Sequence, residues 1–464
     1  MRGIMRRKIA VGLVLTLTLP LSIVAGGETE EVAAKIVGAA LIESRAYEKL
    51  AYLSDRIGHR LSGSEALERA VRWTAAELER DGIERVWTEK VMVPRWVRGH
   101  GVSRIVAPVE WEMATLALGG SVGTPEGGIT AEVIEVATFD ELEQAGEAVR
   151  GKIVLFNKAM DETTGYGTVV KLRGGGASAA VKLGAVGMLI RSLGTADYRL
   201  PHTGALNYEK DVPKIPAAAV AAEDAELIHR LLQSGDPVRV TLDLGCKTLA
   251  DSESANVIAE IRGREKPEEI VLIGAHLDTW DVGQGAHDDG AGCAIVMETM
   301  RLLEELDLTP RRTIRAVLFT NEENGLRGGR DYAERHRREL HVAAIESDSG
   351  GGTPRGFGIT AGEGGVKMLE RITRHLSTIG ADDVRPRGGG ADIGPLKKQG
   401  VPVIGLRQDT ERYFDYHHTE ADTLDKVDRH DLDRNVAAMT LVAYMLAEQD
   451  GVLPRVEPEA ATEE

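Results

Sequence analysis

Five acidic and histidine side chains in the second half of this 464-residue chain are spaced as a two-metal hydrolytic centre requires. The five ligand candidates are His276, Asp288, Glu323, Asp348 and His418. Two divalent ions about 3.5–4 Å apart need a bridging carboxylate, terminal ligands on each side and a base for the attacking water. The carboxylate of Glu322, beside the third candidate, can serve as that base. The sequence therefore predicts metal-assisted hydrolysis.

The first candidate lies in the segment Gly274-Ala-His-Leu-Asp278, at the end of an apolar run. Residues two apart in an extended segment point to the same face. The carboxylate of Asp278 is therefore expected to accept the second ring N–H of His276 and to leave the other ring nitrogen for a metal. A histidine at a strand end is more often structural, so this assignment depends on the other candidates.

A glycine-rich turn, residues 285–290, delivers Asp288 just before a predicted helix. Helix N-termini favour carboxylates, and Asp289 is interpreted as such a cap. Asp288 is the candidate for the bridging ligand because the turn follows closely after the strand end that carries His276.

Two adjacent carboxylates, Glu322 and Glu323, follow the next apolar run. Adjacent residues at a strand end point in different directions, so one can bind a metal while its neighbour takes a proton from water. An isolated Glu-Glu pair is usually a solvated surface, but this one is at the strand-to-helix position where α/β proteins place active sites. Asp348 follows a further run, and alone it would read as a turn residue. Of His417 and His418, the second is preferred as a ligand because a threonine follows it.

An α/β pattern from residue 254 onward positions these side chains. The predicted strands are 257–261, 270–275, 314–320, 342–345 and 403–406, and the predicted helices are 291–306, 326–337, 366–377 and 432–447. Upstream, residues 32–81 read as helical with a loop at 56–64, Gly82 ends the helical part, and a strand follows at 86–93.

Residues 101–244 have a different character, because short β-like runs alternate there with glycine-rich turns. The predicted strands are 129–136, 152–156, 186–190 and 238–242, and the predicted helices are 177–183 and 222–233. This segment is therefore expected to form a separate, strand-rich domain.

The net charge of −17 argues against nucleic acid or an anionic membrane as the main partner. At the N-terminus, basic residues precede an apolar run from Ile9 to about Val24, and small residues follow at Ala25 and Gly26. This pattern predicts a cleaved signal peptide and an exported protein, periplasmic or extracellular. The alternative is a membrane anchor, because the run approaches the minimum spanning length.

Only two cysteines, Cys246 and Cys293, are present. An exported protein can pair them, or both can be buried and free, and the sequence leaves these alternatives open. In either case the metal site is expected to use nitrogen and oxygen ligands.

The joint order His-x-Asp, Asp-Asp-Gly, Glu-Glu, Asp and His-Thr resembles that of the co-catalytic zinc peptidases, which include bacterial leucyl aminopeptidases and glutamate carboxypeptidases. Segments outside the metal motifs resemble the carboxypeptidase Q branch of this family, over roughly residues 45–450. These segments are Pro94-Arg-Trp-Val-Arg-Gly99, Gly123-Thr-Pro125, Ile129-Thr-Ala-Glu-Val133, Pro201-His-Thr-Gly204, Val212-Pro-Lys-Ile-Pro216 and Trp280-Asp-Val-Gly-Gln-Gly285. One departure is His287, where that branch has an apolar residue.

The resemblance implies two zinc ions per chain and a role for each candidate. His276 and Asp348 would hold one ion, Glu323 and His418 the other, and Asp288 would bridge them. Glu322 would be the general base and later the proton donor, and Asp278 would orient His276. The resemblance further implies a cis peptide bond between Asp288 and Asp289, and hydrolysis by a metal-bridging water without a covalent intermediate.

The implied fold is a three-layer αβα zinc-peptidase domain with a mixed central sheet and an inserted, strand-rich protease-associated domain. The expected boundaries are a signal peptide at 1–26, the N-terminal part of the peptidase domain at 27–105, the inserted domain at 106–250, the zinc peptidase domain at 251–450 and a disordered acidic tail at 451–464. The resemblance also suggests a homodimer with no stable membrane span after signal cleavage.

The function expected is that of a zinc-dependent exopeptidase acting on short unblocked peptides, dipeptides in particular. The alternatives are an aminopeptidase acting on longer peptides and a non-catalytic, receptor-like member of the same fold. A serine hydrolase is a third reading, because Gly119-Gly-Ser-Val-Gly123 matches a nucleophile elbow, but a turn at 124–128 stands where that fold needs a helix. Asp392 and Arg407 are candidates for lining the pocket or for a structural loop.

Overall fold

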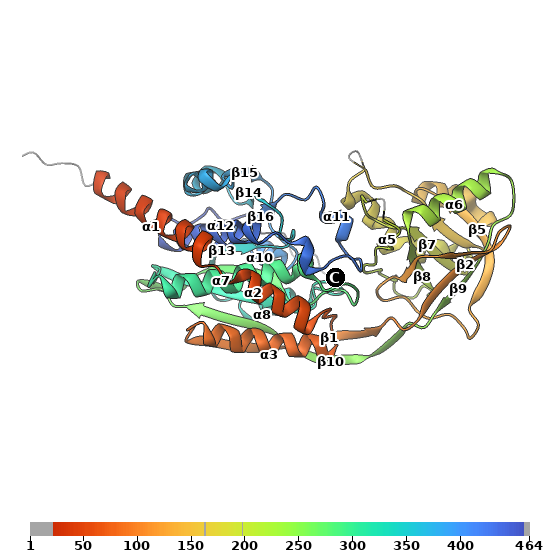
Figure 1. Ribbon diagram of the computed structural model, residues 1–464, viewed down its shortest axis with the longest axis horizontal. Coiled ribbons are helices and arrows are strands. Elements are labelled where there is room, and N and C mark those ends of the chain that lie inside the picture. The colour runs from red at the N-terminus through yellow and green to blue at the C-terminus, as the bar shows by residue number, and fades with distance from the viewer. Residues whose placement is uncertain (1–21, 162–163, 197, 459–464) are drawn as a thin grey trace, which may run out of the picture.

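Two eight-stranded mixed sheets organise the chain in the computed structural model, which describes residues 22–161, 164–196 and 198–458. The sheets lie side by side along the long axis of the molecule, and the long strands β1 and β10 run from the first toward the second (Figure 1). The first sheet carries the ligand candidates. The second sheet belongs to residues 101–244, which we call the insert.

The first sheet has the strand order β1-β10-β12-β11-β13-β16-β14-β15. Its strands are β1 (Arg85–Val97), β10 (Lys247–Ile261), β11 (Lys266–His276), β12 (Arg312–Phe319), β13 (Leu340–Glu346), β14 (Pro354–Thr360), β15 (Asp383–Pro386) and β16 (Val403–Gln408). Strands β12, β11, β13 and β16 are parallel neighbours, so their carboxyl ends meet at one edge of the sheet. Ligands bind at this edge in open α/β sheets.

Helices cover both faces of the first sheet. One face packs against α1 (Ser22–Glu43), α2 (Ala46–Ala51), α3 (Glu65–Arg80), α7 (Ala291–Glu305), α9 (Gly365–Thr373) and α12 (Arg429–Glu448), and the other against α8 (Arg327–Arg335) and α10 (Gly394–Lys398). Successive side chains along a strand point to opposite faces of the sheet. Val271 and Ile273 lie in the larger core, whereas Leu272 lies in the smaller one. The predicted three-layer αβα architecture is therefore confirmed.

The insert contains the second sheet, with the strand order β3-β2-β9-β5-β6-β7-β8-β4. Its strands are β2 (Gly101–Ala107), β3 (Trp111–Met113), β4 (Thr115–Ala117), β5 (Ile129–Val136), β6 (Ile153–Phe156), β7 (Gly187–Arg191), β8 (Ala217–Val220) and β9 (Arg239–Leu244). Its α-helices are α4 (Phe139–Ala145), α5 (Tyr166–Lys182) and α6 (Ala222–Gln233). The remaining helical segments of the described residues are η1 (Tyr52–Ile57), η2 (Gly146–Val149), η3 (Ala286–Gly290), η4 (Arg374–Ile379), α11 (Tyr413–Tyr416) and η5 (Leu424–Lys426).

Several predicted elements differ from the structure for local reasons. Strand β5 and helix α6 have the predicted bounds, but α5 begins eleven residues before the predicted start at 177. The run Gly174–Gly176 argues against a helix because glycine has low helix propensity. It is accommodated because a Cβ at Gly176 would lie 2.8 Å from both Met188 and Phe156, so the helix packs closely on its sheet. Strands β14 and β15, which contain proline, glycine and charged residues, were not predicted.

The predicted limits of the insert, 106 and 250, fall inside strands β2 and β10. Its identification as a protease-associated domain stays a prediction. The predicted disordered tail was wrong for residues 451–458, because Leu453 is 2% exposed and the amide of Val456 donates to the carbonyl of Gly400. Residues 459–464 and residues 1–21 of the predicted signal peptide lie outside the described part of the chain.

Both cysteines are buried and free. Of the two alternatives that the sequence left open, the structure therefore has the unpaired one. Burial raises the pKa of the Cys246 thiol to about 11. Within the described residues, none of the helices combines the length and the apolar character needed to cross a membrane.

Candidate metal centre

Three neighbouring strand ends bring ligand candidates together. His276 is the last residue of β11, Glu323 follows the end of β12, and Asp348 follows the end of β13. Because β12, β11 and β13 are adjacent and parallel, these side chains meet at the carboxyl edge of the first sheet. His418 comes from the loop after α11, and its backbone has the unusual φ of 62°.

Asp288 lies at the centre of this group, in the turn that precedes α7. Its Oδ1 is 3.2 Å from Nε2 of His276, and its Oδ2 is 3.1 Å from Nε2 of His418. The peptide bond between Asp288 and Asp289 is cis, as the resemblance implied. One carboxylate thus faces a histidine on each side, which is the arrangement a bridging ligand needs.

Each side of Asp288 has a further carboxylate. Nε2 of His276 is 3.4 Å from Oδ1 of Asp348, and Nε2 of His418 is 3.2 Å from Oε2 of Glu323. His276, Asp288 and Asp348 can share one ion, and Asp288 also groups with the histidines at 417 and 418. All five predicted ligand positions are therefore brought together.

The prediction that the carboxylate of Asp278 accepts the second ring N–H of His276 was wrong about the accepting atom. Nδ1 of His276 donates to the backbone carbonyl of Asp278, at 2.9 Å, and not to its carboxylate. That carboxylate instead accepts the amides of Glu322 and Glu323, at 2.9 and 3.3 Å, and the hydroxyl of Ser62 at 3.3 Å. The backbone of Asp278 therefore fixes the tautomer of the ligand candidate His276. Its side chain fixes the turn that carries Glu322 and Glu323.

Two adjacent histidines, His417 and His418, both approach Oδ2 of Asp288 and are alternative ligands there. The rings of His417 and His418 stack with their centroids 3.6 Å apart. Nδ1 of His418 donates to the carbonyl of Thr203 at 3.2 Å, so its Nε2 keeps a lone pair directed at Asp288 and Glu323. Nε2 of His417 lies 3.5 Å from Asp288, and its buried Nδ1 has no hydrogen-bond partner among the described residues. The geometry favours His418 as the ligand.

Two further residues support the bridging turn and were missed in the sequence. Asp422 accepts the amides of Ala286 and His287 through Oδ1, at 3.1 and 2.7 Å, and the amide of Asp288 through Oδ2, at 3.2 Å. The guanidinium of Arg60 is fully buried and donates to backbone carbonyls of the same loop, including that of Gly285. Asp422 lies three residues after Thr419, close to the predicted ligand His418, so its acidic side chain was a usable signal, whereas nothing local distinguishes Arg60.

The other polar residues of these motifs have structural partners. Asp289 lies one residue before Gly290, the N-cap of α7; its carboxylate accepts the amide of Gly292 in the first turn of that helix and also the amide of His276. His287 accepts the amide of Gly351 at Nδ1, and its Nε2 lies 3.2 Å from a backbone carbonyl. It therefore ties two loops together and does not face the metal positions.

The two candidates for lining the pocket lie elsewhere. The carboxylate of Asp392 is buried, and within the described part of the chain neither of its oxygens has a hydrogen-bond partner. Arg407 pairs with Asp383 at 2.7 Å, next to the far edge of the sheet. Neither residue lines the cavity over the metal site.

A cavity of about 330 Å³ opens onto this group of ligands. Its floor is formed by Asp288, Glu322, Glu323, Asp348 and His418, and its walls include Tyr413 and Phe414 from α11 together with Tyr166 and Arg173 from α5 of the insert. The carboxyl edge of the first sheet and helix α5 of the insert therefore both contribute to the site. Among the described residues that line the cavity, Arg173 is the only lysine or arginine.

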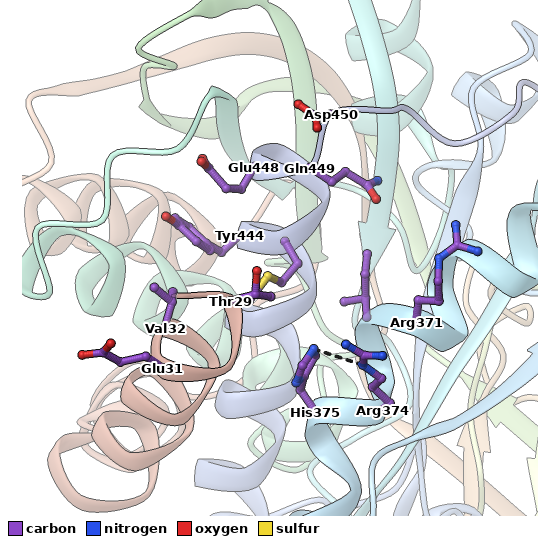
Figure 2. Close-up of a pocket in the computed structure, with 12 residues that line it drawn as sticks. Thr29, Glu31, Val32, Arg371, Arg374, His375, Tyr444, Glu448, Gln449 and Asp450 are labelled. Atoms are coloured by element: carbon purple, nitrogen blue, oxygen red, sulfur yellow. Dashed lines mark hydrogen bonds between the residues drawn. The ribbon is translucent and has the colours of Figure 1, made fainter. Parts of the chain in front are cut away.

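A larger cavity, of about 660 Å³, lies between α1, α9 with η4, and α12 (Figure 2). Arg371, Arg374 and His375 line one side of it, and Glu31 and Glu448 come from the two other helices. It contains none of the ligand candidates. Size alone therefore does not identify the reactive site in this molecule.

Several carboxylates lie close together in this site, and their mutual repulsion and burial change the pKa values of its residues. Burial and repulsion from Asp288 raise the pKa of Glu323 to about 7. Burial, with repulsion from Asp348 and Glu323, raises the pKa of Glu322 well above its usual value. Burial works against charging His276, but its contacts with Asp288 and Asp348 outweigh this and raise its pKa well above the usual value.

The residues fit a pair of divalent cations. Four carboxylates face one buried site, and such a concentration of negative charge is unfavourable unless cations compensate it. Imidazole nitrogens and carboxylate oxygens are the ligands of catalytic zinc sites, and each histidine has its second ring N–H fixed by a carbonyl.

The serine-hydrolase reading fails on geometry. Ser121 is fully buried, and its hydroxyl accepts the amide of Ala217 and donates to the carbonyl of Val122. Trp96 donates from its ring to the carbonyl of the same serine at 2.9 Å. A buried hydroxyl that is fully used in this way is a structural group in the insert.

Comparisons with known proteins agree with the geometry. A profile of peptidase family M28 matches residues 256–443. The chain is 41% identical over 431 residues to carboxypeptidase Q of Mus musculus, and the match covers 92% of this chain and 91% of that protein. It is similar to the structure of a peptidase M28 precursor from Shewanella amazonensis, with a TM-score of 0.89, 39% identity and coverage of 93% and 100%. The zinc aminopeptidase BSAP from Bacillus subtilis has a similar fold, with a TM-score of 0.65, 21% identity and coverage of 87% and 95%.

Proposed function

We infer that this chain, which belongs to the carboxypeptidase Q branch of peptidase family M28, is a zinc-dependent exopeptidase that hydrolyses short unblocked peptides, dipeptides in particular. The observation that carries this proposal is the position of Asp288 between two histidines, with Glu323 and Asp348 on opposite sides. That arrangement suits two ions that share one carboxylate.

His276 and Asp348 would hold one zinc ion, His418 and Glu323 the other, and Asp288 would bridge them. Bound zinc supplies Lewis acidity that activates water and polarises the scissile carbonyl. The chain itself has to hold and move the proton. Glu322 lines the cavity beside these ligands, and the carboxylate of Asp278 fixes its backbone amide. We assign to the Glu322 carboxylate the acceptance of the water proton and its delivery to the leaving amine.

Arg173 supports a requirement for a free C-terminus. It faces a cavity whose other charged groups are carboxylates and histidines, and it is held there by the carbonyls of Thr203 and Ala205 at 3.2 Å. A buried guanidinium binds a carboxylate through charge-assisted hydrogen bonds. We assign the terminal carboxylate of the substrate to Arg173. The wall formed by Tyr166, Tyr413 and Phe414 is suited to an apolar or aromatic substrate side chain.

The test is hydrolysis of matched dipeptides that are free, N-acetylated or C-amidated, with and without a metal chelator. Chelator-sensitive cleavage confined to the free dipeptides is the expected result. Cleavage of the amidated peptides as well would favour the aminopeptidase alternative, and cleavage of the acetylated peptides as well would favour a strict carboxypeptidase. The absence of turnover in the zinc-loaded protein would favour the receptor-like alternative.

Export and assembly are part of the same proposal and rest on the resemblance and on the N-terminal pattern. The mature protein is expected to begin near residue 27, which N-terminal sequencing of the protein from its natural compartment tests. A homodimer is expected, and light scattering during gel filtration measures its mass. A chain that keeps residues 1–26, or one that elutes as a monomer at micromolar concentration, would refute the corresponding part.

A further inference from the structure

Three segments that resemble the carboxypeptidase Q branch contain none of the five ligand candidates, yet one hydrogen-bonded cluster unites them. Arg98 follows β1, Asp281 lies in the loop after β11, and Thr203 lies in the insert between β7 and β8. Nε of Arg98 donates to both carboxylate oxygens of Asp281, at 3.1 and 3.0 Å, and NH1 donates to the hydroxyl of Thr203 at 3.1 Å. The guanidinium also lies over the ring of Trp96, with 5.0 Å between its Cζ and the ring centroid.

Thr203 connects this cluster to the ligand candidate His418 by hydrogen bonds. Its hydroxyl donates to the carbonyl of Ala117 while accepting from Arg98, which leaves its orientation fixed. Its amide donates to the carbonyl of His418 at 3.0 Å, and its own carbonyl accepts from Nδ1 of His418 at 3.2 Å. Thr203 is fully buried, so water does not replace these contacts.

Close packing reinforces the same junction. A Cβ at Gly119 of the insert would lie 1.9 Å from the ring of Trp280, so only glycine allows this contact. Trp280 packs edge-on against His418 with 5.7 Å between the ring centroids, and its amide donates to Glu323 at 3.2 Å. The insert is therefore tightly packed against the His418 side of the centre.

The two sides of the centre differ in how they are supported. His276 is fixed by the carbonyl of Asp278, two residues along its own chain segment. His418 is fixed by the carbonyl of Thr203, which lies in the insert, 215 residues away in sequence. Outer partners of a ligating histidine set its ring orientation and basicity. Among the described residues, the insert therefore supplies the Nδ1 partner of His418 and not that of His276.

We propose that Arg98 and Thr203 are positioning residues through which the insert controls metal retention at the His418 side of the centre, while the His276 side is independent of them. This inference rests on the proposed function, since it takes His418 as a zinc ligand. It assigns to the insert a role in building the metal site, in addition to covering it.

The test is the release of Zn²⁺ from the full-length, zinc-loaded protein into a chromogenic chelator. In Thr203→Val, which keeps the shape and the backbone carbonyl but loses the hydroxyl, we expect one of the two ions to leave about 10-fold faster, the lower end of the effect of outer-partner substitutions. The second ion should leave at the wild-type rate. Thr203→Ser, which keeps the hydroxyl, should restore the wild-type behaviour.

Controls separate this effect from general destabilisation. Thr195→Ala removes another contact between the insert and the peptidase part, the 2.8 Å hydrogen bond to Asp415, and should leave both release rates unchanged. If Thr203→Val does not fold, Arg98→Lys, which loses the planar fork, is expected to show the same selective loss. Adding Thr203→Val to His418→Ala should not speed release of the remaining ion, because the effect runs through His418.

Equal acceleration of both ions, or no acceleration in Thr203→Val and Arg98→Lys, would overturn the inference and leave the metal centre standing. A wild-type protein that binds no zinc would instead refute the proposed function itself. The two failures are therefore distinguishable in one measurement.

Discussion

At the scale of single residues, Glu322 carries the proposed proton transfer. Replacing it with glutamine keeps the size and the backbone amide bonded to Asp278 but removes the proton acceptor. We expect Glu322→Gln to lower kcat by about 10²–10⁴-fold, the usual contribution of a general base. Steady-state kinetics on a free dipeptide measure this, and zinc content should stay at the wild-type level. A variant with more than half of the wild-type kcat would show that the base lies elsewhere.

Arg173 gives a second prediction, concerning the substrate end that is recognised. Removing its charge-assisted hydrogen bonds should raise KM for free dipeptides by about 10–100-fold, corresponding to about 1.5–3 kcal/mol. Arg173→Met should therefore lose the preference for free over C-amidated dipeptides, whereas Arg173→Lys should keep part of it. An unchanged preference in Arg173→Met, with zinc content intact, would contradict the assignment.

The ligand candidates were predictable as a group because each is next to a local signal. His276 ends an apolar run, and Asp288 lies in a glycine-rich turn before a helix. Arg173 and Thr203 were not predictable as parts of the site, because only the folded insert brings them to His418, more than 200 residues away in sequence. The partner of His276 was misassigned because the two-residue alternation holds within a strand, and β11 ends at His276 itself.

At the scale of elements, ion pairs connect the end of α8 to β1. His336, directly after α8, lies 3.0 Å from Glu89 in β1 and 3.1 Å from Glu339. Burial works against the charged imidazole, but the two carboxylates outweigh it and raise the pKa of His336. A pKa above the unfolded value of about 6.5 means that the stabilisation is complete below that pH and is lost as pH rises through the folded pKa.

The resulting prediction concerns Tm as a function of pH. His336→Gln should lower Tm more at pH 6 than at pH 9, because the stabilisation by the charged ring is lost as pH rises through its raised pKa. The exposed His430→Gln serves as a control that should not change this dependence. A deficit that is larger at pH 9 than at pH 6 would contradict the assigned direction of the pKa shift.

The elements themselves were predictable where patterning and propensity agree. The buried strands β11 and β12 are continuous apolar runs, and most of their length was predicted. Helix α5 and strands β14 and β15 were missed in whole or in part, because glycine, proline and charge argue locally against structures that tertiary packing imposes.

At the scale of the whole molecule, folding brings several carboxylates into one buried site, so cation binding should stabilise the fold. Zinc at 100 times its Kd is expected to add about 2.7 kcal/mol per independent site and to raise Tm. Differential scanning calorimetry with and without zinc measures this. Asp288→Asn, which weakens the shared ligand, should lose most of the increase, and an equal increase in that variant would indicate zinc binding elsewhere.

The most direct test of the two-metal exopeptidase is a titration of Zn²⁺ into the metal-free protein, with hydrolysis of an unblocked dipeptide followed at each step. We predict no turnover without metal, and a rise to full activity that ends at two ions per chain. Turnover in the metal-free protein, full activity at one ion, or no turnover at saturating zinc would each contradict a centre in which Asp288 joins two catalytic ions.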